Sequence, residues 1–222
     1  MKLPISLLPI LLFLSITASG QNNKKFDDFV KQFPKISLPA IIKYSKAEFK
    51  TEYYTPEEDT TKGTIPYHDH VLPKDSSLLI SYELMKSFLL NDTESVPPFF
   101  INGEVTDTVY PVYYVTAQLK TNKDFICLIY EMQYNIGSGN PNAEKYVCTL
   151  TKTGKLIDKL LVASANYSGT GILTESFRVP WFPDVQSKIS KDLIIITTES
   201  GDVKGHYQLN TKGNFIKKKS NQ

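Results

Sequence analysis

The chain has 222 residues, and 25 Lys or Arg against 23 Asp or Glu give it a formal net charge of +2. Hydrophobic residues make up 41% of the chain. This composition excludes a disordered chain and a protein that binds polyanions through bulk charge. The two cysteines are too few for a disulfide-dense scaffold or a four-cysteine zinc site.

The first twenty residues have the pattern of a secretory signal peptide. A basic start at Lys2 precedes an apolar run over 3–18, and the small residues Ala18 and Gly20 predict cleavage before Gln21. The alternative is a retained membrane helix. However, the run is interrupted by prolines and is shorter than the roughly twenty residues that a span needs. We therefore expect a periplasmic or extracellular protein with no transmembrane segment in its mature chain.

Two short helices are expected in the region 21–109. Apolar residues recur at helical spacing over 25–33, which Pro34 ends, and again over 81–90. Residues 36–50 are ambiguous and are consistent with one irregular strand. Residues 51–77 are rich in Thr, Pro, Asp and Lys, which is typical of a long loop. We expect this region to pack on a core formed by 110–222, as a single domain.

Strand-like runs separated by short polar turns follow one another from about residue 110. A Lys-Asp pair at 123–124 recurs at 191–192, and the turn glycine Gly154 recurs at Gly213, in the same order. Two such units fit an internal repeat of roughly sixty to seventy residues. The prediction is a mainly β protein. It consists of two four-stranded antiparallel meanders that form a sandwich or a barrel-like sheet, with two short N-terminal helices.

Cys127 and Cys148 lie in two of these strand-like runs. In an exported protein they could form a disulfide if the two strands pair with one cysteine facing the other. That register also places Glu131 opposite Glu144, which is an unfavourable like-charge pair. The alternative is two buried free thiols in neighbouring strands. The sequence leaves both open.

His68-Asp69-His70 is the triplet with the strongest chemical character. In an extended segment, His68 and His70 point to the same side and could share a divalent metal ion. A zinc site needs at least one further protein ligand, and loop histidines are usually solvated. The pair is therefore a candidate metal site that lacks a complete ligand set. No other cofactor is indicated.

The segment 179–184 is the preferred ligand-binding candidate. It contains Trp181, the only tryptophan, beside Phe182, between two prolines and just before Asp184. Rigid aromatic loops commonly anchor a partner or stack on a sugar. The alternative is that Trp181 fills one end of the β core.

The layout resembles that of uncharacterised exported β-rich proteins of Bacteroidetes. The residues that carry this resemblance are the short leader before Gln21, the Phe26, Phe29, Phe33-Pro34 pattern, and a Thr-x-x-Gly-Lys-x-Ile-Asp strand end at 151–158. The resemblance implies an all-β core and an extracytoplasmic location. It implies no activity and no active-site residues.

These observations favour an exported, non-catalytic binding protein of the cell envelope that engages a protein or a glycan. One alternative is a periplasmic metal-dependent or hydrolytic enzyme that uses His68 and His70. Another is an immunity or inhibitor protein directed against a toxin or lysozyme. Nucleic-acid binding is not expected, because basic and aromatic residues do not alternate on one surface.

Overall fold

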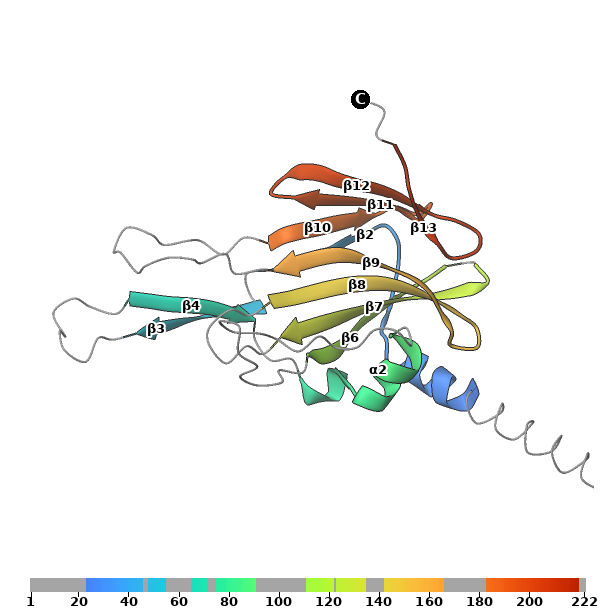
Figure 1. The fold of residues 1–222 in the computed structure, drawn as a ribbon, viewed down its shortest axis with the longest axis horizontal. Coiled ribbons are helices and arrows are strands. Elements are labelled where there is room, and N and C mark those ends of the chain that lie inside the picture. Colours follow the sequence, from blue (N-terminus) through green and yellow to red (C-terminus); the bar gives the residue numbers. More distant parts are fainter. Residues whose placement is uncertain are drawn as a thin grey trace, which may run out of the picture.

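The computed structural model describes residues 23–45, 48–54, 65–71, 75–90, 111–121, 123–134, 142–165 and 183–219. The chain is mainly β in these segments (Figure 1). The strands are β1 (Lys35–Ile36), β2 (Ala40–Ile42), β3 (Phe49–Tyr54), β4 (Ile65–Val71), β5 (Leu79–Ile80), β6 (Val112–Leu119), β7 (Phe125–Tyr134), β8 (Asn142–Thr151), β9 (Leu156–Ala165), β10 (Pro183–Ile189), β11 (Ile194–Glu199), β12 (Asp202–Leu209) and β13 (Phe215–Lys217).

The two predicted helices are present. One covers residues 23–31, and the second, α2, covers Tyr82–Phe88 after a single 3-10 turn, η4 (Ser76–Leu78). The Ser81 side chain caps α2 by accepting a hydrogen bond from the backbone N–H of Leu84 at 3.4 Å. Glu83 lies in the first turn and Lys86 in the last, so both charges interact favourably with the helix dipole.

The prediction of two separate four-stranded meanders is wrong. Strands β6 to β13 follow one another without a break in a single sheet of eleven strands, because β9 pairs with β10 through Ala165 and Ser164. The sheet is mixed, since β1 pairs in parallel with β6. It is one continuous sheet and does not close into a barrel. Across the sheet, the order of hydrogen-bonded strands is β1 followed by β6 to β13.

The turns that suggested a repeat have matching geometry. Gly154 and Gly213 both adopt a φ of 89°. Their N–H groups bond to the carbonyl oxygens of Thr151 and Asn210 respectively, three residues back. Glycine adopts this left-handed conformation without the steric cost that other residues incur. The repeated turns therefore mark equivalent hairpins within one sheet.

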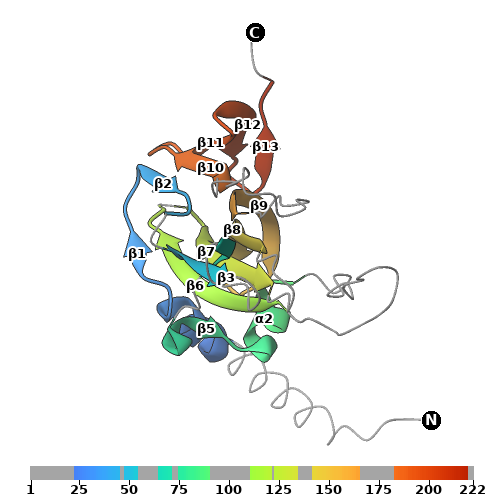
Figure 2. The same ribbon diagram turned by 90° about the vertical axis from the view of Figure 1, so that its left-hand side faces the viewer.

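The sheet curves around an inner hydrophobic core (Figure 2). Strands from both halves of the sheet contribute to this core. The buried residues from β6, β7 and β8 include Leu119, Ile129 and Val147, and those from β10 and β11 include Ile189 and Ile195. The second half of the sheet therefore folds across the first, and the apolar side chains between them are removed from water.

A second hydrophobic core lies on the outer face of β6, β7 and β8, under the helices. Phe26, Phe29 and Phe88 form its aromatic centre, with Phe29 stacked on Phe88 at 5.2 Å between ring centroids. Gly154 lies against this group. A Cβ atom at that position would approach a ring carbon of Phe26 to 2.8 Å. The phenylalanine stripe at 26–33 is therefore a packing surface between helix and sheet.

Residues 35–42 connect distant parts of the sheet. β1 pairs with β6 through Lys35 and Ile36, whereas β2 pairs with β10 through residues that include Ile41 and Ile42. β10 pairs with β9 over its first residues and with β2 over its last three. The segment considered ambiguous from sequence is thus two very short strands, each held by a different partner.

The expected loop over 51–77 is also wrong in part. β3 and β4 form a separate two-stranded antiparallel sheet, with Phe49 opposite Val71 at its base. Within the described segments, no helix is long and apolar enough to cross a membrane.

Candidate functional site

The structure only partly places the predicted aromatic site. Trp181 and Phe182 lie outside the described residues. The backbone of Asp184 belongs to β10, while its side chain is outside the description.

His68 and His70 lie in β4. The backbone register places His68 opposite Glu52 and His70 opposite Lys50 in β3. Their side chains are outside the description. Among the side chains that are described, no three His, Cys, Asp or Glu residues lie close enough together to hold a metal ion.

The two cysteines form no disulfide. The register of β7 and β8 places Cys127 opposite Thr149 and Cys148 opposite Leu128, one residue away from the pairing that a bridge requires. Cys127 belongs to the inner core and Cys148 to the outer core, so the sheet separates them. Burial raises the pKa of Cys127 to about 12 and also raises that of Cys148. Both thiols are therefore inert, buried apolar groups.

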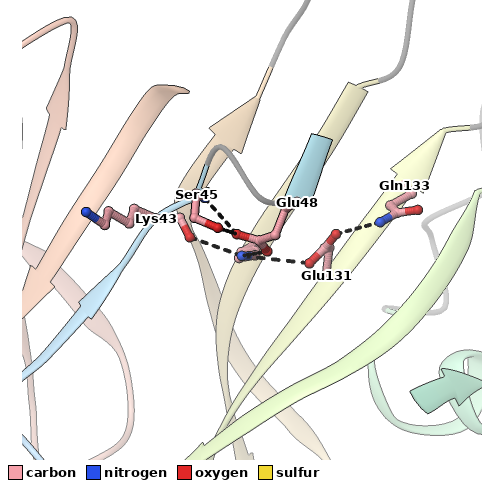
Figure 3. A network of polar contacts seen from close by, with 6 residues as sticks. Lys43, Ser45, Glu48, Glu131 and Gln133 are labelled. Carbon is pink, nitrogen blue, oxygen red and sulfur yellow. Dashed lines mark hydrogen bonds and ion pairs between the residues drawn. The ribbon is translucent and has the colours of Figure 1, made fainter. Parts of the chain in front are cut away.

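A charged network is buried on the inner face, where β7 and β8 meet the segment 43–48 (Figure 3). The Lys145 ammonium donates to Glu48 Oε1 at 2.8 Å and to the carbonyl oxygen of Lys43 at 3.1 Å. It lies 3.9 Å from Glu131 Oε2 and 4.0 Å from the centroid of the Tyr44 ring. Glu131 is 0% exposed. Its other oxygen accepts a hydrogen bond from Gln133 at 2.7 Å.

The protonation states in this network follow from burial and the neighbouring charges. Burial acts to raise the pKa of Glu48, but hydrogen bonds from Lys145 and Ser45 outweigh it and hold the pKa below its usual value. The pKa of Tyr44 is raised by burial and by the carboxylates of Glu131 and Glu48. Tyr44 therefore stays neutral.

This network anchors the chain. The contacts of Lys145 bind residues 43–48, which lead into β3, to the two central strands β7 and β8. Its ammonium is enclosed by protein oxygens and the Tyr44 ring. Sequence reasoning missed this group although a signal was present. Glu131 alternates with the core residues Ile129 and Cys127 and so occupies a buried face.

The candidate surface for a partner is the face of the second half of the sheet that no described segment covers. Six large hydrophobic residues of the described segments are exposed. Four of them are on the strands β2, β11, β12 and β13: Ile41 (61% exposed), Ile196 (36%), Val203 (63%) and Ile216 (46%). The other two, Leu79 and Tyr82, lie beside or within α2.

Strand register places these four residues on one face. Ile41 and Ile196 both pair with Lys188 of β10, one from each side. Val203 pairs with Thr198, two residues from Ile196, and Ile216 shares its partner Gln208 with Ile194. Paired residues point to the same side of a sheet, as do residues two apart in a strand. We call this surface, on β2 and β10–β13, the aliphatic face.

The helices do not reach the aliphatic face. They pack on β6, β7 and β8, while β10 to β13 lie at the opposite side of the molecule (Figure 1). Isolated exposed aliphatic residues are common, whereas several on one side of a sheet are typical of an interaction surface. Searches against known protein families, curated proteins and solved structures gave no match for this chain.

Proposed function

We propose that this is an exported protein that binds another protein, without catalysing a reaction, through the aliphatic face. The observation that carries the proposal is that Ile41, Ile196, Val203 and Ile216 lie on one side of the sheet, which no described segment covers. The buried ionic groups at Lys145 and Glu131 already bind protein atoms, which supports a binding role over a catalytic one.

Export is supported by the leader sequence. The apolar run over 3–18 and the small residues before Gln21 match a signal peptide. A mass spectrum of the protein recovered from an envelope fraction should show a mature chain beginning at Gln21. We likewise propose a relationship to the exported β-rich proteins of Bacteroidetes.

A protein partner is favoured over a glycan. Glycan platforms use aromatic rings, whereas the exposed apolar residues of the aliphatic face are isoleucine and valine. Trp181 and Phe182 directly precede β10 in the sequence, so we propose them as a second contact. An inhibitor or immunity protein would bind its target through the same kind of surface.

Capture experiments with matched variants test this function. The wild-type protein and an Ile196→Ser/Val203→Ser variant would be immobilised and exposed to the same envelope extract. A Leu79→Ser/Tyr82→Ser variant loses the other two exposed hydrophobic residues and serves as the control. Retention of one partner by the wild type and the control, and its loss by the face variant, is the expected result. Equal retention by all three proteins would contradict the proposal.

A further inference from the structure

We infer that the partner of the aliphatic face is a protein surface whose apolar centre is surrounded by carboxylates. This inference rests on the proposed function and adds the chemistry of the partner to it.

The aliphatic face is basic. Lys188 lies between Ile41 and Ile196 and is exposed. Lys43 is exposed and follows the buried Ile42, and its side chain points away from the charged network in Figure 3. At the far edge, the N–H of Lys218 bonds to the carbonyl oxygen of His206, which extends the pairing of β13 with β12. Lysines therefore lie at both edges of the aliphatic face and in its middle.

No carboxylate neutralises these lysines among the described side chains of the face. Acidic residues border the face at two turns: exposed Asp192 lies between β10 and β11, and Glu199 and Asp202 pair with each other between β11 and β12. Glu199 is already paired there with Lys204 at 2.9 Å. Because the whole chain carries only two more basic than acidic residues, this segregation is local. This excess of positive charge among the described side chains of the face is the basis for the chemistry of the partner.

Apolar and cationic side chains alternate across the strands. A row that runs from β2 through β10 to β11 reads Ile41, Lys188, Ile196, with about 4.8 Å between neighbouring strands. A lysine stem covers apolar surface while its ammonium reaches outward. A complementary surface therefore presents Val or Leu against the isoleucines and Asp or Glu against the lysines. Such pairing increases the rate of encounter and excludes wrong partners.

This pattern argues against a second copy of the chain as the occupant. In a symmetric face-to-face dimer, the same basic patch would meet itself. Lysine would then approach lysine without a described carboxylate between them.

A defined acidic probe tests the inference on the full mature chain. The probe is a fluorescent 16-residue peptide that repeats Glu-Glu-Val-Val, so each face of an extended strand carries both residues. Its Lys-Lys-Val-Val counterpart, the lysine–valine peptide, is the negative control. We expect saturable binding of the acidic peptide, which weakens as NaCl rises from 20 to 300 mM. Lys43→Glu/Lys188→Glu should weaken it at least tenfold. The Lys31→Glu/Lys86→Glu variant carries the same charge change on the two helices and should bind like wild type.

Three outcomes would overturn the inference. They are equal binding of the acidic peptide by both lysine variants, binding of the lysine–valine peptide, and binding of phosphatidylglycerol vesicles in place of the peptide. Repeating the envelope capture with Lys43→Glu/Lys188→Glu separates the two proposals. If capture survives the lysine changes but is lost in Ile196→Ser/Val203→Ser, the carboxylate inference fails while the proposed function stands.

Discussion

The Oδ2 atom of Asp158 in β9 accepts a hydrogen bond of 2.8 Å from the backbone N–H of Phe215 in β13, 57 residues further along the chain. The hairpin bonds of β12 and β13 join His206 to Lys218 and Asn210 to Asn214, so the N–H of Phe215 points away from β12. Asp158 satisfies this exposed edge group in place of a neighbouring strand. This side-chain hydrogen bond therefore links β9 to β13, two strands that do not pair with each other.

Replacing Asp158 by alanine should destabilise the protein. The change leaves the N–H of Phe215 without its acceptor and releases the C-terminal hairpin from β9. We expect a loss of about 1–3 kcal/mol in the free energy of unfolding, measured by urea denaturation. Asp124→Ala removes an exposed carboxylate, paired only with exposed Lys152, and should leave the unfolding midpoint unchanged. Equal midpoints for both variants would show that the Asp158 contact does not hold the hairpin.

Thr149→Val should be coupled to Asp158→Ala. The Thr149 hydroxyl donates to the carbonyl oxygen of Gly213 at 2.6 Å, and so holds the same hairpin. The single change should cost about 1 kcal/mol. Because both contacts depend on one docked hairpin, the double variant should lose less than the sum of the two. Strict additivity in a double-mutant cycle would mean that the contacts act independently.

Two glycine substitutions separate backbone strain from packing. Gly154 and Gly201 have φ angles of 89° and 93°, so alanine is strained at both, by about 1–2 kcal/mol. A Cβ atom at Gly201 meets nothing within 4 Å, whereas one at Gly154 meets Phe26 and Phe88. Gly154→Ala should therefore cost a further 1–3 kcal/mol, roughly the penalty of overpacking. Thermal unfolding of the two variants gives the difference directly, and similar melting temperatures would contradict the helix contact.

Lys145→Met should be strongly destabilising at neutral pH, by about 3–5 kcal/mol, because the buried carboxylate of Glu131 loses its cation. The stabilisation that the Lys145–Glu48 pair gives to the wild type should decrease in acid. The folded-state pKa of Glu48 is lowered, so its stabilisation is complete above about 4.5 and is lost as the pH falls through the lower folded value. The gap between wild type and variant should therefore narrow in acid. Urea midpoints at pH 7 and pH 3.5 measure it, and a constant gap would exclude the ionic interaction.

Both cysteines should be free but unreactive in the native protein. Burial raises the pKa of each thiol, so the reactive thiolate is absent at pH 8. We expect two thiols per chain to react with a chromogenic disulfide reagent in denaturant without reductant, and none under native conditions. Finding no thiols after denaturation would mean that the two residues are joined.

Much of the second half of the fold could be predicted because its signals are local. Alternating apolar residues and the turn glycines Gly154 and Gly213 located the strands and hairpins. The continuity of the sheet could not be predicted. It depends on the pairing of Pro183 and Val185 with β9, which no local pattern encodes. β1 and β2 are too short to show any periodicity and exist only through their partners.

The buried network could in principle have been found from charge pairing. The register that faces Cys127 with Cys148 sets Glu131 against Glu144, whereas the observed register sets Glu131 against Lys145. Like-charge repulsion thus favours the register without a disulfide. The aliphatic face could not be found in this way. Its members come from four strands, and only strand pairing places Ile41 and Ile196 on either side of Lys188.

The double pairing of residues 35–42 has a consequence for biogenesis. β2 lies near the N-terminus and is synthesised early, whereas its partners Ser187 to Ile189 are synthesised much later. If the chain enters the envelope as a linear thread, this N-terminal segment must wait unpaired until almost the whole polypeptide has followed. Folding that depends on such distant partners is slow. A holding chaperone at the exit site would therefore benefit this protein more than one built from neighbouring hairpins alone.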